Sequence, residues 1–172
     1  MKKAYFLLLF FATIVSSTSG VYAQTSWVTK KIDSKLSVKF PAEPTKTTKD
    51  GVEAYILKSS DSTSYSSALV DFNVLAKVDS ATLAPIKDTK EFATQMREGV
   101  AAQKTNYSFS DINIGTWKNY TTYSITGLDT SKKKKLFIYM ILIGSKMYTL
   151  SCLVPDGLVT KNNEVFFNSV SL

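Results

Sequence analysis

The sequence predicts an α+β domain built around an antiparallel sheet. Several short runs alternate apolar and polar residues as half-buried strands do, and one segment repeats apolar residues every four positions as a helix does. A long apolar hairpin pattern follows near the end of the chain. The patterns occur in the order strands, helix, strands, helix, without internal repeats, so a single layered domain is expected.

The hairpin pattern occupies residues 136–155, LFIYMILIGSKMYTLSCLVP. Residues 136–143 carry no charge and Gly144-Ser145 follows at once, which favours a buried strand over a helix. The run is also shorter than the roughly 20 apolar residues that a membrane helix needs. A two-residue turn at Gly144-Ser145 would pair Ile141 with Tyr148, whereas a longer bulged loop would shift this register by one residue.

In the two-residue register, both faces of the first hairpin strand are apolar. Phe137 and Ile138 point to opposite sides of the sheet, so each side must be covered by another layer. Cys152 shares the face of Phe137 and Tyr148, where it would lie in the core as a small apolar side chain. A single cysteine cannot form an intramolecular disulfide.

The segments ahead of the hairpin supply the other strands. Four strands are expected before the helix, at residues 26–32, 36–40, 52–58 and 68–76. Pro41 and Pro44 end the second strand, because proline cannot donate to a ladder. A turn is expected at residues 49–51, and the serine-rich residues 59–67 are expected to form a flexible hairpin tip. In the fourth strand, the side chains expected to face the core are those of Ala68, Val70, Phe72 and Val74.

One helix is expected in the middle of the chain. Asp88 and Glu91 have the spacing of a capping box, which marks the start of a helix of about four turns. Phe92, Met96 and Val100 recur at four-residue spacing, so this helix, ending near residue 104, should lay one stripe on the sheet.

Further strands and a second helix are expected behind it. The β-prone segments are residues 109–114 and 120–128, joined by a connection at residues 115–118. A polar loop at residues 129–135 leads into the hairpin. The last helix is expected at residues 158–169.

The N-terminal segment predicts export. Lys2 and Lys3 precede an apolar stretch at residues 4–15 and a small-residue segment that ends in Val21-Tyr22-Ala23. This is the pattern of a secretory signal peptide cleaved between Ala23 and Gln24. We expect residues 1–23 to be removed, and residues 24–172 to form one domain without a transmembrane segment. Its expected location is the periplasm or the extracellular space.

The composition excludes most catalytic classes. The chain contains no histidine, which rules out mechanisms that need an imidazole base or ligand. Its aspartates lack calcium-loop spacing, and its seven glycines form no phosphate-binding loop. We therefore predict no catalytic residue, no metal site and no cofactor. The net charge of +7 is modest and no nucleic-acid-reading motif accompanies it, so nucleic-acid binding is not expected.

Two features are candidates for binding. The first is a lysine run formed by Lys132, Lys133, Lys134 and Lys135. It could contact phosphate, lipid head groups or an acidic partner, or it could be a solvated loop that keeps the apolar strand from pairing with another chain. The second is Trp117, beside an expected turn. Ser131 and Lys134 also match the Ser-x-x-Lys spacing of some hydrolases, but no further motif element accompanies them.

Several segments together resemble the PsbP-like superfamily. They are VKFPAEP, TKEFATQMREGVAAQK, YTTYSITG, the hairpin pattern and the terminal FFNSVSL. This superfamily includes the photosystem II extrinsic subunit, a nuclear-import cofactor that binds the GTPase Ran, and DcrB-type exported bacterial proteins. The resemblance implies an α/β/α sandwich around a strongly twisted antiparallel sheet and a non-enzymatic accessory role. Metal binding in photosynthetic members relies partly on histidines, so no metal site is carried over.

Three hypotheses for the function follow. The first is a non-catalytic exported binding module that contacts a protein partner in the cell envelope. The second is a peripheral binder of anionic membrane or polyanion through the lysine run. The third, a hydrolase with Ser/Lys or carboxylate chemistry, has the least support in the sequence.

Overall fold

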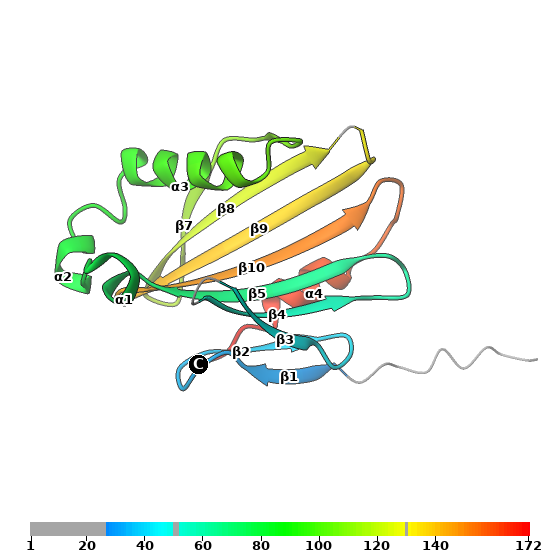
Figure 1. Cartoon of the computed structure of the whole chain (residues 1–172), viewed down its shortest axis with the longest axis horizontal. Coiled ribbons are helices and arrows are strands. Elements are labelled where there is room, and N and C mark those ends of the chain that lie inside the picture. Colours follow the sequence, from blue (N-terminus) through cyan, green and yellow to red (C-terminus); the bar gives the residue numbers. More distant parts are fainter. Residues whose placement is uncertain (1–26, 50–51, 130) are drawn as a thin grey trace, which may run out of the picture.

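The computed structural model describes residues 27–49, 52–129 and 131–172 of the chain. The expected signal peptide at residues 1–23 and the centre of the expected turn at residues 49–51 lie outside these residues. An eight-stranded antiparallel sheet dominates the fold, with the strand order β3-β4-β5-β10-β9-β8-β6 and β7 also paired with β8 (Figure 1). Its strands are β3 (Thr45–Lys49), β4 (Val52–Lys58), β5 (Ser64–Asp71), β6 (Ser108–Phe109), β7 (Asn113–Trp117), β8 (Tyr120–Asp129), β9 (Lys134–Ile143) and β10 (Lys146–Pro155).

The remaining elements lie on the two faces of this sheet. A separate two-stranded sheet is formed by β1 (Val28–Lys31) and β2 (Ser37–Phe40). The helices are α1 (Phe72–Ala76), α2 (Ser80–Leu83), α3 (Lys90–Gln103) and α4 (Asn162–Asn168). In Figure 1, α3 lies along the β7–β8 side of the sheet, and α4 lies behind β5 and β10. The α+β class with an antiparallel sheet is confirmed.

The central hairpin has the register that the sequence predicts. Ile143 pairs with Lys146 and Ile141 with Tyr148, across a two-residue turn in which Gly144 has a positive φ of 64°. Glycine takes this left-handed conformation without a steric cost, which is why the turn can be this short. β10 also pairs with β5, and β9 with β8, so the hairpin lies in the middle of the sheet.

The two faces of β9 belong to two separate apolar layers. Ile138 is 7% exposed and packs with Met140, Leu142 and the helix α3 residue Phe92. On the opposite face, Ile141 and Ile143 pack with β2, α4 and Ile32, which follows β1. Phe137 joins this second layer only partly buried. The expected double coverage is therefore present, but it is incomplete at Phe137.

The strand expected at residues 68–76 is shorter than predicted. β5 ends at Asp71, which pairs with Lys146, the first residue of β10, so the chain beyond Asp71 has no neighbouring strand to bond with. Asp71 instead accepts hydrogen bonds from the Asn73 backbone N–H and the Ser145 hydroxyl, both at 3.0 Å, and caps α1. Val74, expected in the core, is 67% exposed on α1.

Other boundaries also differ from the predictions. β3 was missed, because the side chains of residues 45–48 are exposed on a sheet edge and give no apolar pattern. The serine-rich tip is confined to residues 59–63, since β5 already begins at Ser64 and Tyr65 is fully buried. The connection expected at residues 115–118 is mostly strand β7, and the chain turns at Lys118, whose φ is 54°.

The observed helix ends also differ from the predicted ones. Thr89, not Asp88, caps α3, because its hydroxyl accepts the Phe92 backbone N–H at 3.2 Å. Asp88 is engaged elsewhere, as described below. The short helix α2 was not predicted, and the last helix is confined to Asn162–Asn168 instead of residues 158–169.

Asp33 ties the small β1–β2 sheet to the main sheet. Its Oδ2 accepts hydrogen bonds from Lys146 Nζ at 2.9 Å and from the Tyr148 hydroxyl at 2.8 Å, while Oδ1 accepts the backbone N–H groups of Lys35 and Leu36. Burial alone would raise the pKa of Asp33, but these four hydrogen bonds outweigh it and lower the pKa from 3.8 to about 2.

Asp33→Asn should therefore destabilise the protein in a pH-dependent way. A carboxyl whose pKa is lowered on folding stabilises the protein above its unfolded pKa and loses that contribution as the pH falls through the folded value. We expect the variant to lose about 2 kcal/mol of unfolding free energy at neutral pH. The difference from the parent should shrink between pH 4 and pH 2, as measured by urea unfolding. A constant difference, or an equal loss in the exposed control Asp111→Asn, would contradict this role.

Cys152 lies in the core, as expected. Its side chain is fully buried, and burial raises the pKa of the thiol from 9.0 to about 12. We predict that the native protein will not react with a thiol reagent at pH 8, and that labelling in increasing urea will follow the unfolding curve. Rapid labelling in the absence of urea would show that this part of the core opens locally.

Candidate functional site

The lysine run lies at one end of the sheet, where β8 passes into β9. The Asp129 side chain is buried and accepts hydrogen bonds from the Ser131 hydroxyl (2.6 Å) and the backbone N–H groups of Ser131 and Lys132. The bond from the Ser131 hydroxyl and the two backbone bonds hold the pKa of Asp129 below its ordinary value. Lys132 and Lys133 are exposed.

The Ser131–Lys134 pair is not a hydrolytic dyad. A nucleophilic serine must pass its proton to a neutral lysine amine. Here the Ser131 hydroxyl donates to the Asp129 carboxylate instead, and Lys134 is already part of β9.

Trp117 is far from the lysine run. It pairs with Tyr120 at the start of β8, whereas Asp129 and Lys134 pair at its other end, about 30 Å away for a ten-residue strand. The indole packs against the Tyr120 ring at 6.5 Å, and Lys118 Nζ lies 4.9 Å from its centre. The two binding candidates therefore do not form one site.

A groove on the α4 side of the sheet does include one residue of the lysine run. Two hollows of ≈220 Å³ each share Phe137, and together we call them the aromatic groove. The first is lined by Ser110, Asn113, Ser124, Ile125, Thr126, Phe137, Ile138, Tyr139 and Phe167. The second is lined by Lys135, Phe137, Val154, Pro155, Asp156, Gly157, Leu158, Thr160 and Asn163.

The groove exists because α4 covers only part of its side of the sheet. Phe166 is fully buried between Tyr65 of β5 and Phe40 of β2, with ring centres 5.2 Å away in both cases. The next residue, Phe167, turns toward β9 and meets Tyr139 edge to face at 6.2 Å. Beyond this contact none of the described helices lies over the same face of β8, whose Ser124 and Thr126 remain half-buried.

Two polar groups of the groove have no charged or hydrogen-bonding partner within the part of the chain that the structure describes. Asn163 lies four residues before Phe167, on the same face of α4, and its Oδ1 is buried without a hydrogen bond. Lys135 Nζ lies 5.0 Å from the centre of the Phe137 ring and forms no salt bridge with any described carboxylate. The one carboxylate in the wall is Asp156, whose backbone N–H donates to the Lys133 carbonyl.

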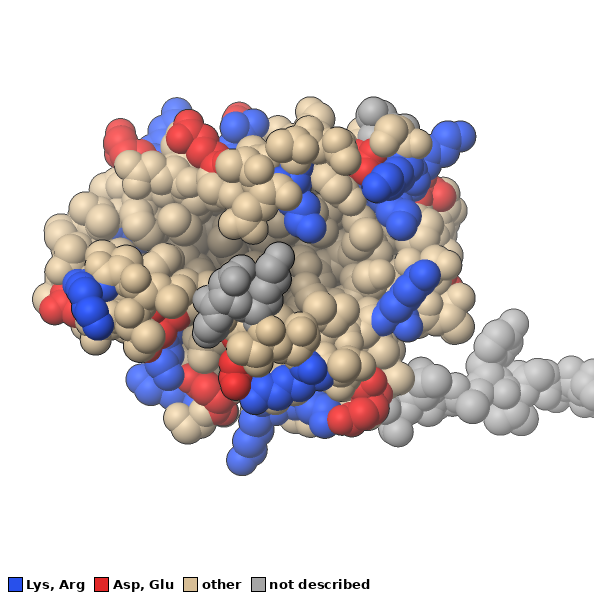
Figure 2. All heavy atoms as spheres, viewed as in Figure 1, with Lys and Arg blue, Asp and Glu red and all other residues tan. Residues whose placement is uncertain are grey.

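The opposite side of the sheet is hollowed as well. Figure 2 shows a depression between α3 and the β3–β4 side, with mainly uncharged residues inside and lysines around its rim. The strands there carry small side chains such as Ala68 and Thr149, and the hydroxyls of Ser66 and Ser151 bond to each other at 2.6 Å. Because these groups satisfy one another, this depression offers less to a ligand than the aromatic groove does.

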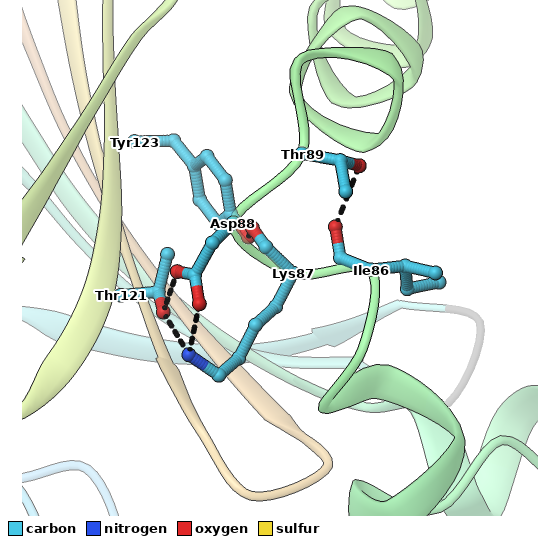
Figure 3. A network of polar contacts seen from close by, with 6 residues as sticks. All are labelled: Ile86, Lys87, Asp88, Thr89, Thr121 and Tyr123. Carbon is cyan, nitrogen blue, oxygen red and sulfur yellow. Dashed lines mark hydrogen bonds and ion pairs between the residues drawn. The ribbon is translucent and has the colours of Figure 1, made fainter.

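A Lys–Asp–Thr cluster superficially resembles a catalytic triad. Lys87 Nζ lies 2.6 Å from Asp88 Oδ2 and 2.8 Å from Thr121 Oγ1, beside a hollow of ≈110 Å³ (Figure 3). The Thr121 hydroxyl donates to Asp88 Oδ1 at 2.7 Å. Its proton thus points to a carboxylate and its lone pair to an ammonium, so the hydroxyl is not poised as a nucleophile.

The cluster has a structural role instead. Hydrogen bonds from Lys87 and then Thr121 lower the pKa of Asp88, which keeps the ion pair charged. The buried Tyr123 hydroxyl donates to the Lys87 carbonyl (Figure 3). Together these contacts fasten the α2–α3 connection to β8. Sequence reasoning missed them, because residues 33 to 36 positions apart carry no shared motif.

The described residues contain neither a cluster of metal-ligating side chains nor a helix that could span a membrane. In residues 27–49, 52–129 and 131–172, no three acidic or cysteine side chains converge as a metal site requires. No helix in the same residues is both long and apolar enough to span a bilayer.

The comparisons with known proteins identify the fold. No protein-family model and no curated protein matches the sequence. The solution structure of cyanobacterial PsbP (CyanoP) from Synechocystis sp. PCC 6803 is similar, with a TM-score of 0.59 at 9% identity, over 86% of this chain and 93% of that chain. A crystal structure from Bacteroides thetaiotaomicron has a TM-score of 0.46 at 11% identity, over 83% of this chain and 47% of that one. The chain therefore has a PsbP-like fold, and at these identities the likeness extends to the fold alone.

We predict that Asp129→Asn will loosen the lysine run. The amide removes the charge that holds the Ser131 hydroxyl and two backbone N–H groups, so this turn should open more often. Limited digestion with a protease that cleaves after lysine should cut at residues 132–135 several-fold faster than in the parent, with cleavage after Lys58 as the internal control. An unchanged rate at residues 132–135, or an equal acceleration of cleavage after Lys58, would contradict the anchoring role of Asp129.

Proposed function

We propose that this chain, with its PsbP-like fold, is a non-catalytic binding module that contacts a protein partner in the cell envelope through the aromatic groove. The observation that carries the proposal is the groove itself. It combines exposed aromatic surface with an unpartnered buried acceptor and an unpaired lysine, all held on rigid elements. Binding sites typically join an apolar surface to a few convergent polar groups in this way.

The polar clusters elsewhere support a non-catalytic role. The carboxylate oxygens of Asp33, Asp88 and Asp129 accept hydrogen bonds that hold loops or helices in place. Ser131 and Thr121, the hydroxyls nearest to lysines in the two dyad-like arrangements, both donate to carboxylates. The accessory role implied by the PsbP-like resemblance agrees with this distribution.

The envelope location rests on the N-terminal sequence. Its charged start, apolar stretch and small-residue cleavage motif are those of a secretory signal. Export would place the domain in the periplasm or outside the cell, where a partner would meet the groove.

A second candidate function is contact with an anionic membrane. It is favoured by the exposed Lys132 and Lys133 at the tip of the β8–β9 turn. This function predicts binding to vesicles containing phosphatidylglycerol that weakens steeply with salt and is lost when residues 132–135 become glutamine. Absence of vesicle binding at low salt would eliminate it.

Site-specific photo-cross-linking tests the protein-contact proposal. We expect p-benzoylphenylalanine in place of Tyr139 to form an adduct with one envelope protein in the producing cells, because this position lies inside the groove. The same photoreactive residue in place of Val74, which is 67% exposed on α1, is the control and should give none. No adduct from position 139, or equal adducts from both positions, would contradict the proposal.

A further inference from the structure

We infer that the occupant of the aromatic groove is an extended peptide segment of the partner in which an aromatic residue and a group of acidic residues lie a few residues apart. The inference rests on the proposed function and specifies the chemistry of the partner. It follows from four properties of the groove: the spacing of the β9 side chains in it, its aromatic lining, its unpartnered hydrogen-bond acceptor and the charges around it.

The repeat of the groove matches an extended chain. Lys135, Phe137 and Tyr139 are alternate residues of β9 and therefore lie on one face, about 7 Å apart along the strand. A peptide that lies over this face of β9 in an extended conformation presents every second side chain at the same interval. One such segment can thus place three alternate side chains at Tyr139, Phe137 and Lys135.

The aromatic end of the groove suits a planar apolar side chain. Phe137, Tyr139 and Phe167 form its walls, with the hydroxyls of Ser124 and Thr126 at the edge. The edge-to-face contact of Tyr139 with Phe167 leaves ring surface facing the groove, where another ring can pack at a similar angle. An aromatic anchor would bury the apolar surface that α4 leaves open.

The acceptor in the second hollow calls for a donor. Asn163 Oδ1 is buried and unbonded among the described residues, a state that is unfavourable unless a ligand or a water molecule supplies an N–H or O–H. The backbone N–H groups of a peptide are suitable donors. A phosphodiester offers only acceptor oxygens, so the groove fits a peptide better than it fits the phosphate of a lipid.

The charge distribution determines which part of the peptide lies beside the lysine run. The four lysines of the lysine run form no salt bridge with described carboxylates, and Lys135 is the member that reaches the groove. Asp156 in the wall disfavours acidic side chains inside the second hollow. The acidic residues of the peptide therefore lie outside the hollow, against the exposed Lys132 and Lys133. The aromatic residue lies beside Tyr139.

Fluorescence anisotropy with a defined probe tests this arrangement on the parent protein. The probe is a dye-labelled peptide with one phenylalanine followed by a short alanine–serine spacer and a run of glutamates. We expect saturable binding, which should weaken about tenfold when the phenylalanine is replaced by alanine, because the buried ring surface is lost. Replacing the glutamates by glutamine should weaken binding by about tenfold at low salt.

Three variants separate the groove from general electrostatics. Gln at positions 132, 133, 134 and 135 should weaken probe binding about tenfold and flatten its salt dependence. The matched control changes four other exposed lysines to Gln and so alters the net charge equally; these are Lys35, Lys77, Lys90 and Lys104. Asn163→Leu removes the unpartnered acceptor, so it should melt no lower than the parent and yet bind the probe several-fold more weakly.

Each contrary result has a defined meaning. The inference would be overturned if the two lysine variants weakened probe binding equally. It would also be overturned if the parent bound the probe without phenylalanine as tightly as the original probe. In either case binding would depend on net charge alone. Unchanged probe affinity of Asn163→Leu would also overturn it. If no probe binds but the photo-cross-link from position 139 persists, the inference fails and the proposed function stands. Displacement of the probe by phosphatidylglycerol vesicles in the parent but not in Asn163→Leu would assign the groove to lipid.

Discussion

The structure depends on burying both faces of one strand. β9 has no charged residue from Leu136 onward, so a layer must lie on each side of it, and the sheet must continue on both of its edges. Helix α3 supplies one layer, and the β1–β2 sheet with α4 supplies the other. The hairpin β9–β10 is central for the same reason: only an interior position hides a strand with no polar face.

The two layers are not equally complete. On the α3 side, Phe92 and Ala93 are buried directly against the sheet. On the other side, α4 is seven residues long and buries only Phe166, so Phe137 and Tyr139 stay half-buried. The aromatic groove is thus a consequence of a short helix over a broad sheet. The aromatic rings, Lys135 and Asn163 lie on β9 and α4, which hold them in place, while residues 156–160 of the β10–α4 connection complete the wall.

Aspartates hold the connections between these layers. Asp33 fastens the small sheet to β10, Asp71 begins α1 and meets the hairpin turn, Asp88 fixes the α2–α3 connection, and Asp129 shapes the turn that carries the lysine run. Each uses the several acceptor positions of a carboxylate to bond two or more donors at once. These four aspartates therefore act at separate junctions of the fold.

The sequence by itself determined the hairpin register, the burial of both faces of β9, the core position of Cys152 and the placement of the long helix. These features follow from the spacing of apolar residues along the chain and from the glycine in a short turn. Both signals involve residues that are close in the sequence. Tertiary structure alone decided that β5 ends at Asp71, that residues 45–49 form an edge strand, and that Trp117 and the lysine run stand apart. It also brought Lys135, Tyr139 and Asn163 to one groove, because such meetings depend on which strand or helix is available as a neighbour, and no local pattern records that.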